Sequence, residues 1–425
     1  MKRALILVSF LLPVSLLFLS CGSSPSSSGG GSGLKFRAFI SQDVNAGNVA
    51  AGVQIIDAEK DARAFVAPIS AGATPGPMVV TPNRVQTLVF SAADNILTFI
   101  SNGGESAFAR LTLPGFTESL VVSPDSLTAY VAVPTAPMVA QPPGAVEVIN
   151  LNTGAITAQL SVPAVRHLSI SNTGTRVLAF SDNSDVVSVI TPSNIGTPIN
   201  PVVPVPGPPF FDRPVMAFFS ADDNIAFVVN CGAECGGTQA GVQTLDLSQS
   251  PPVASLPVAV PAASFAVLDG TTMYLAGTPI PASPCTGQTT AATSCGLLTV
   301  FDLTSMTVTN TGIVITDGYH NRMALGANGK LFVGAHTCTE IIPPIPPPQG
   351  AEVRGCLSIY DTQSGAVVIP PANGDVTGIQ PIATRKVVYV VQGGELQIYD
   401  TTTDKVQAKQ IDIIGRAVDV KTVDF

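Results

Sequence analysis

The chain has 425 residues, enough for two or three average domains or for one large repeat architecture. Its 46% apolar residues can build a substantial core, which argues against global disorder in spite of 38 glycines and 36 prolines. Only 12% of the residues are charged and the net charge is −9, which excludes a nucleic-acid-binding protein that works by neutralising phosphates. There is no dinucleotide-binding glycine motif, P-loop, HExxH or GxSxG motif, so the sequence predicts no cofactor.

The first 20 residues have the pattern of an export signal. Lys2 and Arg3 form a positive start, and an apolar run of 16 residues follows over 4–19. A membrane-spanning helix needs about 20 apolar residues, so this run suits the hydrophobic region of a signal peptide. The segment ends in Phe18-Leu19-Ser20-Cys21, which resembles the bacterial lipobox and implies lipidation of Cys21. The alternative is an ordinary secretory signal in which Cys21 is incidental.

A flexible tether follows the predicted lipidation site. Residues 22–33 have the sequence GSSPSSSGGGSG, which as a random coil spans roughly 20 Å. Without Lys2 and Arg3 the chain carries 18 basic and 29 acidic residues, so we expect membrane contact only through the lipid anchor. Gly22, rather than an aspartate, implies onward transport to the outer membrane, on its periplasmic or surface-exposed face. The predicted division is a signal peptide at 1–20, the lipidated cysteine and tether at 21–33, and the folded body at 34–425.

One β-rich unit recurs eight times along the folded body, at intervals of 39 to 59 residues. Each copy ends in an apolar pair followed in most cases by Asp or Asn, which suits the first position of a turn. A strand precedes each copy, another strand lies ahead of that one, and a short run follows. Four short strands per unit without helical periodicity predict a β-propeller. The copies end at Asp57, Ser101, Asn150, Thr191, Asp246, Asp302, Asp361 and Asp400.

The two ends of the repeat region complement each other. The first copy begins at Leu34–Ile40 without its leading strand, and an orphan strand follows the last copy at Ala417–Phe425. If the orphan supplies the missing strand, the terminal segments form one blade and no sheet edge stays open. We therefore predict an all-β propeller of eight four-stranded blades. The alternatives are seven blades, if the weak unit at Val186–Thr191 is not one, and several unrelated β-domains in a row.

The units are similar to those of the bacterial YVTN-repeat propellers, which are related to the lactonase-type propellers. The best match is SPDSLTAYVAV at 123–133 followed by GAVEVINLNTGAI at 144–156, and the resemblance extends over 34–425. It implies a fold far more than an activity. Most such proteins are secreted or surface proteins of unassigned function, and a minority resemble sugar-lactone hydrolases.

Six further cysteines form three close pairs in three consecutive units, each between the second and third strands. The resemblance implies that these connections open on the face that holds the channel entrance. In an exported protein, close pairs favour disulfides, and rigid loops on one face suggest a binding surface. The alternatives are that the disulfides only protect exposed loops, a zinc site near His336 and Cys338, or a redox role for the first pair; we predict no metal site. The pairs are Cys231/Cys235, Cys285/Cys295 and Cys338/Cys356.

Several polar residues share one position, near the start of the first strand of their unit, where they could ring the channel entrance. Clustered guanidinium groups would favour a carboxylate, a phosphate or an acidic sugar, because arginine offers paired donors. The alternative is that Arg–Asp and Arg–Glu pairs tie neighbouring blades together. A hydrolase would need a water-activating base, for which His320 and Glu118 are the candidates. The set is Glu118, Arg166, His167, Asp212, Arg213, Tyr319, His320, Arg322 and Arg416.

The sequence favours an exported, lipid-anchored binding or scaffold module over an enzyme, because no convergent catalytic set is visible. The expected partner is a protein, a cell-wall glycan or a small acidic ligand, and no nucleic acid. The alternatives are a lactonase-like hydrolase with its site at the channel mouth, and a purely structural role at the cell surface.

Overall fold

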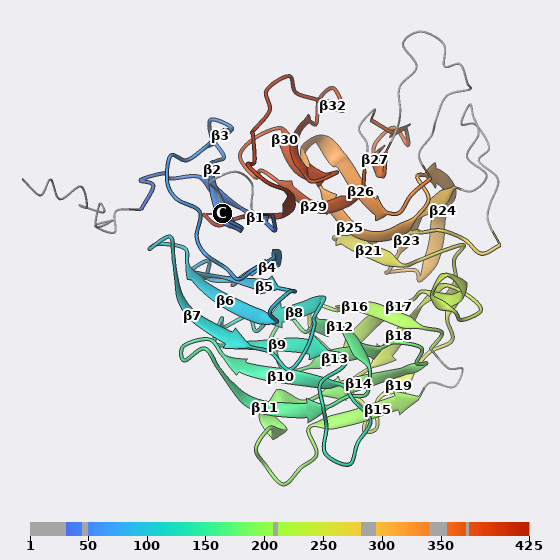
Figure 1. The fold of residues 1–425 in the computed structure, drawn as a ribbon. Helices are drawn as coiled ribbons and strands as arrows, with labels where there is room; N and C mark the ends of the chain where they lie inside the picture. Colours follow the sequence, from blue (N-terminus) through green and yellow to red (C-terminus); the bar gives the residue numbers. More distant parts are fainter. Residues whose placement is uncertain are drawn as a thin grey trace, which may run out of the picture.

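The computed structural model describes residues 31–44, 50–206, 211–281, 295–339, 355–370 and 374–424. These residues form eight antiparallel sheets around a common axis, an eight-bladed β-propeller (Figure 1). Helix in the described residues is limited to three single 3₁₀ turns, η1 (Pro192–Asn194), η2 (Gly232–Cys235) and η3 (Ala327–Gly329). The prediction of eight blades is confirmed. The weakly matching repeat at Val186–Thr191 contains β14 (Val186–Ile190), the third strand of a complete blade, so the seven-bladed alternative is wrong.

Each of the seven continuous blades has four strands in sequence order from the axis to the rim, and one of them has a fifth short strand, β20. The continuous blades are β4–β7 (Pro75–Val80, Gln86–Ser91, Ile96–Ser101, Ser106–Thr112), β8–β11 (Ser119–Val122, Thr128–Val133, Ala145–Asn150, Ala155–Ser161), β12–β15 (Val165–Ile170, Val177–Ser181, Val186–Ile190, Val202–Pro206), β16–β20 (Pro214–Phe219, Ile225–Asn230, Gly241–Asp246, Val253–Ala254, Val258–Ala259), β21–β24 (Phe265–Asp269, Thr272–Gly277, Gly296–Asp302, Thr307–Ile315), β25–β28 (Tyr319–Leu325, Lys330–His336, Leu357–Asp361, Val367–Val368) and β29–β32 (Val376–Pro381, Val387–Gln392, Glu395–Asp400, Lys405–Val406). The split blade joins β33 (Ala417–Thr422) to β1 (Arg37–Gln42), β2 (Gly52–Asp57) and β3 (Ala62–Arg63).

The split blade closes the ring as predicted. β33 pairs antiparallel with β1, with Ile40 opposite Val420 and Phe39 opposite Lys421. The C-terminus therefore lies beside β1 and β2 (Figure 1). Each first strand contacts the first strand of the next blade around the complete ring, from β33 and β4 to β29 and β33. Closure gives β1 the inner partner that it would otherwise lack as an edge strand.

Two sequence features explain the blades. The inner three strands are apolar on both faces because blades pack face to face, as where Phe180 of β13 packs with Val228 of β17. Six of the eight third strands end in Asp or Asn, whose side chains accept backbone N–H groups of the following turn. Asp361 Oδ1, for example, accepts from the backbone N–H groups of Gln363 and Ser364 at 2.9 and 3.1 Å. These hydrogen bonds confirm the prediction that Asp and Asn at these positions form turns.

Because the four strands alternate in direction, the connections fall on two opposite faces. The mouth face carries the loops between second and third strands and the segments that lead into the first strands. The turn face carries the tight turns between first and second and between third and fourth strands, and the chain enters the described residues there. Ser32 Oγ donates to Glu105 Oε1 at 2.6 Å in the β6–β7 turn, and Arg37 Nη1 donates to the same oxygen at 2.8 Å.

Candidate functional site

The first strands surround the propeller axis, and six of them have a register shift near the mouth face: β4, β12, β16, β25, β29 and β33. Such a bulge inserts one residue and re-aims its neighbours. In β25 the extra residue is Asn321, so that Asn321 and Arg322 both line the central cavity. His320, which precedes them, is 0% exposed and packs away from the axis.

The first strands and the segments beside them enclose a central cavity of about 630 Å³, a volume typical of small-molecule sites. Leu168 of β12, Val215 and Met216 of β16 and Phe265 of β21 give it an apolar wall. A polar wall, formed by Asn321, Arg322, His336 and Thr377, comes from β25, β26 and β29. In the ring of eight, β12 lies across the axis from β29, so the cavity is amphipathic.

The polar wall holds hydrogen-bonding atoms that have no partner among the residues that the structure describes. Arg322 Nε donates to the Thr377 carbonyl at 2.9 Å and Nη1 to the Asn321 carbonyl at 2.8 Å. Within the described ranges, no carboxylate lies at salt-bridge distance from Arg322. Asn321 Oδ1, His336 Nε2 and Thr377 Oγ1 are buried without a hydrogen-bond partner among the same residues. Because buried polar atoms in native proteins are normally paired, this wall is a candidate recognition surface.

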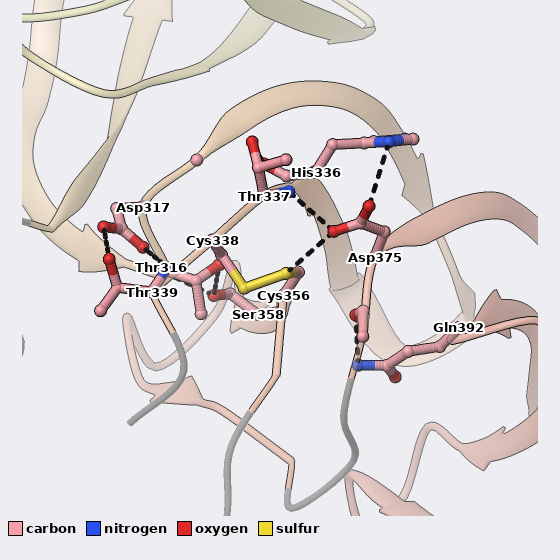
Figure 2. Close-up of a disulfide and its surroundings, with 12 residues drawn as sticks. Thr316, Asp317, His336, Thr337, Cys338, Thr339, Cys356, Ser358, Asp375 and Gln392 are labelled. Atoms are coloured by element: carbon pink, nitrogen blue, oxygen red, sulfur yellow. Dashed lines mark hydrogen bonds and ion pairs between the residues drawn. A yellow bond between two sulfur atoms is a disulfide. The ribbon is translucent and has the colours of Figure 1, made fainter. Parts of the chain in front are cut away.

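Two histidines of the cavity are held neutral by their surroundings. Burial lowers the pKa of His336 and the Arg322 charge lowers it further, against opposing effects of the Asp375 charge, a backbone hydrogen bond at Val376 and the Glu118 charge. Burial also lowers the pKa of His167; the Glu118 and Asp182 charges oppose this effect, and the charges of Arg166 and Arg322 add to it. Figure 2 shows His336 on the strand that leads to the Cys338–Cys356 disulfide, with its Nδ1 3.8 Å from Asp375 Oδ2. Because a lowered pKa favours the neutral form of a histidine, Arg322 is the positively charged side chain of the polar wall.

A second cavity of about 340 Å³ lies beside the channel mouth and gathers five of the predicted residues: Glu118, Arg166, His167, Arg213 and Tyr319. Most of its charges are paired. Arg166 donates to Glu118 at 2.7 Å and to Asp182 at 2.6 Å, and Arg213 contacts Asp185 at 3.4 Å. The Arg166–Glu118 and Arg213–Asp185 pairs connect neighbouring blades, as the alternative interpretation of the arginines expected.

Glu234, which the sequence did not single out, also lines this second cavity. It lies in η2, inside the Cys231–Cys235 disulfide loop, and its Oε2 accepts the Thr278 N–H at 2.9 Å. Burial raises the pKa of Glu234 to about 7, while the hydrogen bonds from Thr278 and Ser264 oppose that rise. Glu234 is therefore the carboxyl group at the mouth that can exchange a proton near neutral pH.

Three predicted residues have other roles. His320 is fully buried, its Nε2 lies 3.0 Å from the Thr316 carbonyl, and burial lowers its pKa to about 4. It lines neither of the two cavities, so the structure places it apart from the other candidate residues. Asp212 accepts the backbone N–H groups of Thr238 and Gln239 and so fixes the disulfide loop. Arg416 is 64% exposed and pairs with Asp43 at 2.6 Å.

Two of the three predicted disulfides are present on the mouth face, Cys231–Cys235 and Cys338–Cys356. Cys338 and Cys356 join the chain that leaves β26 to the chain that enters β27 (Figure 2). Cys338 is therefore unavailable as a zinc ligand with His336, and no group of three or more metal-binding side chains occurs in the described ranges.

Of the third predicted disulfide, Cys285–Cys295, the structure describes only Cys295. Cys295 lies directly before β23, is 5% exposed and is disulfide-bonded. Its predicted partner, Cys285, lies outside the described residues, so the pairing of Cys285 with Cys295 stays a prediction. The same holds for lipidation, because Cys21 and the predicted signal peptide also lie outside the described residues. Among those that are described, no helix is long and apolar enough to cross a membrane.

Comparisons with known proteins support the fold alone. No family model matches the chain. No curated protein sequence matches it either. The chain is similar in structure to the dihydro-heme d1 dehydrogenase NirN, solved in complex with DHE, with a TM-score of 0.61 and 14% identity over 92% of this chain and 75% of that one.

Two other solved structures are similar over most of their length. A functionally unknown protein from Desulfotomaculum acetoxidans has a TM-score of 0.52 and 16% identity, over 79% of this chain and 94% of that chain. The Cps50 (Swd1) β-propeller domain of Myceliophteria thermophila has a TM-score of 0.51 and 9% identity, over 74% of this chain and 93% of that chain. Identities this low carry no activity from one protein to another.

Proposed function

We propose that this chain is an exported, lipid-anchored β-propeller that binds a small ligand in its central channel. The observation that carries the proposal is the cavity of about 630 Å³, whose lining residues Asn321, His336 and Thr377 each hold a buried polar atom without a partner among the described residues. An unpaired buried polar atom costs about 1–3 kcal/mol, which a bound ligand would offset. The disulfides support a rigid entrance on the same face.

The position of the tether favours a channel that opens away from the membrane. Ser32, at the end of the predicted tether, is bonded to Glu105 on the turn face, opposite the mouth. A lipid anchor at Cys21 would then hold the turn face toward the bilayer. The mouth and its disulfide loops would face the aqueous side, where a ligand or a larger partner is accessible.

The test is thermal unfolding of the chain from Gly22 onward, oxidised, against small acids, neutral sugars, wall fragments and divalent metals. A ligand at one hundred times its Kd adds about 2.7 kcal/mol, which shifts the Tm measurably. Val215→Trp should abolish the shift, because Val215 lines the channel. Val203→Trp, at an exposed position of the rim strand β15, should leave the shift unchanged. If no compound shifts the Tm of the wild type, or if Val215→Trp shifts equally, channel binding is rejected.

A hydrolase is the second candidate, and Glu234 is the specific observation that favours it. A carboxyl group with a pKa of about 7 beside an open pocket can act as a general base or acid near neutral pH. The corresponding measurement is turnover of a lactone panel by the wild type and by Glu234→Gln. Equal turnover of both, or no turnover by the wild type, excludes Glu234 as the catalytic group.

A further inference from the structure

The polar wall of the channel contains both an unpaired cation and unpaired acceptors. We propose that the channel binds a small hydroxy acid with an apolar body, whose carboxylate contacts Arg322 and whose hydroxyl group donates its proton to one of two acceptors, Asn321 Oδ1 or His336 Nε2. This inference rests on the proposed function, because it names the ligand class of the same channel.

The carboxylate half of the argument comes from Arg322. Two of its three nitrogens are held by the backbone carbonyls of Asn321 and Thr377, which fix the plane of the guanidinium. The other three arginines predicted at the mouth, Arg166, Arg213 and Arg416, each have a carboxylate partner. Arg322 has none in the part of the chain that the structure describes, and it lines both the central cavity and an adjoining one of about 370 Å³. A fixed, half-buried guanidinium without a counter-ion favours an anion with two acceptor oxygens.

The hydroxyl half comes from the two acceptors. Asn321 Oδ1 has two lone pairs and no donor within the described residues. The Asp375 carboxylate beside His336 Nδ1 favours the tautomer with its proton on Nδ1, which leaves the buried Nε2 as an acceptor. A carboxylate cannot donate to either atom, whereas a hydroxyl group can donate its one proton to one of them. The Thr377 hydroxyl can donate to the ligand or accept from it, so the wall needs a ligand with an anionic acceptor and a donor close together.

Two carboxylates also line the cavity, and both are already compensated. Glu118 accepts from Arg166 at 2.7 Å. Asp419 accepts the Met78 and Val420 N–H groups at 2.9 and 2.8 Å and contacts Lys421 at 3.1 Å. The unbalanced charge of the channel is therefore that of Arg322, which disfavours an amine as ligand. The apolar wall of Leu168 and Phe265 accounts for the apolar body.

Isothermal titration calorimetry of the chain from Gly22 onward with four probes separates the contributions of the ligand's carboxylate, hydroxyl group and charge to the affinity. Mandelate carries the carboxylate, the hydroxyl group and an apolar ring; phenylacetate lacks the hydroxyl group; mandelamide lacks the charge; benzylamine is a cation with the same ring. We expect mandelate to bind most tightly, and phenylacetate and mandelamide each to bind about tenfold or more weakly. Arg322→Gln should weaken mandelate binding about tenfold or more, and Arg322→Lys should restore part of it.

Arg416→Gln is the matched control, because Arg416 is exposed and paired with Asp43 away from the cavity. Its affinity for mandelate should equal that of the wild type, and thermal unfolding of each variant confirms that it is folded. Equal mandelate affinity for the wild type and Arg322→Gln overturns the proposal. So does tighter binding of mandelamide or benzylamine than of mandelate, or no binding of any acid. If a neutral or cationic compound binds and Val215→Trp abolishes that binding, channel binding stands and the hydroxy acid is wrong.

Discussion

At the scale of single residues, Asp61 is a buried carboxylate that joins the split blade to its neighbour. It lies in the β2–β3 turn, is 6% exposed, and accepts from Arg385 Nη2 at 2.6 Å and from the Tyr389 hydroxyl. Burial alone would raise its pKa, but the hydrogen bonds from Arg385 and Tyr389 keep the pKa below its usual value. The stability that this carboxylate supplies is therefore present above about pH 4 and is lost as the pH falls further.

Asp61→Asn should lower the free energy of unfolding by about 2–4 kcal/mol, because it leaves Arg385 without its counter-ion in a partly buried site. Guanidinium unfolding at pH 7 measures this loss. Lys60→Ala is the matched control: Lys60 is 73% exposed and pairs only loosely with Asp57, at 3.8 Å, so its loss should be below about 0.5 kcal/mol. Equal effects of the two substitutions would show that the Asp61 contacts add nothing to stability.

Glu234 predicts a pH dependence of the opposite sign. The unfolded chain releases the Glu234 proton near pH 4.5, whereas the folded chain retains it until about pH 7. The free energy of unfolding should therefore fall as the pH rises through this window, by about 1–3 kcal/mol in total. Urea unfolding at pH 5 and pH 8 measures the change, after subtraction of the same change in Glu234→Gln. Glu59→Gln, at an exposed turn position, should retain the full dependence.

At the scale of elements, the sequence predicts the strands of each blade, but it does not predict which side chains of the first strands face the channel. The third strands are recognisable from sequence because each combines a short apolar stretch with a turn residue that caps the next turn. Six of the eight first strands are bulged, and a bulge changes which residues of a strand share a face. His320 and Arg322 therefore have opposite fates although both were expected at the channel entrance: one is buried between blades and the other lines the cavity.

The missed site residues have the same kind of explanation. His336 ends a second strand and Thr377 forms a bulge of the next blade, so their meeting with Arg322 depends on tertiary packing. Glu234 is a lone carboxyl group in a short cysteine loop, and no spacing rule marks it. Its raised pKa comes from burial, which only the packed structure reveals.

The Cys338–Cys356 disulfide makes a prediction about the loop that joins β26 to β27. It connects cysteines 18 residues apart, and on the chain-entropy model a loop of this length gains about 2–3 kcal/mol. Cys338→Ser combined with Cys356→Ser should lower the free energy of unfolding by that amount. The corresponding double variant of Cys231 and Cys235, only 4 residues apart, should lose less. Thermal unfolding of the two double variants with and without reductant checks this order. Reductant should lower the Tm less in the Cys338/Cys356 variant, which has already lost the larger contribution, and the reverse would contradict the loop-length argument.

At the scale of the whole molecule, the propeller depends on one non-covalent closure. Seven blades are continuous in sequence, and the eighth exists only while β33 lies against β1. The closure is reinforced beyond the strand ladder, since the Arg37 backbone N–H donates to Asp424 Oδ2 at 2.7 Å and Asp419 Oδ2 accepts the Met78 N–H at 2.9 Å in the next blade. The sequence allowed this closure to be predicted, because the first repeat unit lacks its leading strand and an additional strand without a blade of its own follows the last unit.

This closure predicts different outcomes for two rearrangements of the chain. A truncation after Ile413 removes β33, exposes the edge of β1 and the apolar contacts of Val420, and should abolish cooperative unfolding. A circular permutant that joins residue 425 to residue 31 through a short glycine linker, with new ends between Asn152 and Thr153, keeps every strand. Both new ends lie at exposed positions of a β10–β11 turn, so the permutant should unfold within about 1–2 kcal/mol of the parent chain. Circular dichroism through a guanidinium titration distinguishes the two, and a truncated chain with the parent's sharp transition would show that the ring does not need its closing strand.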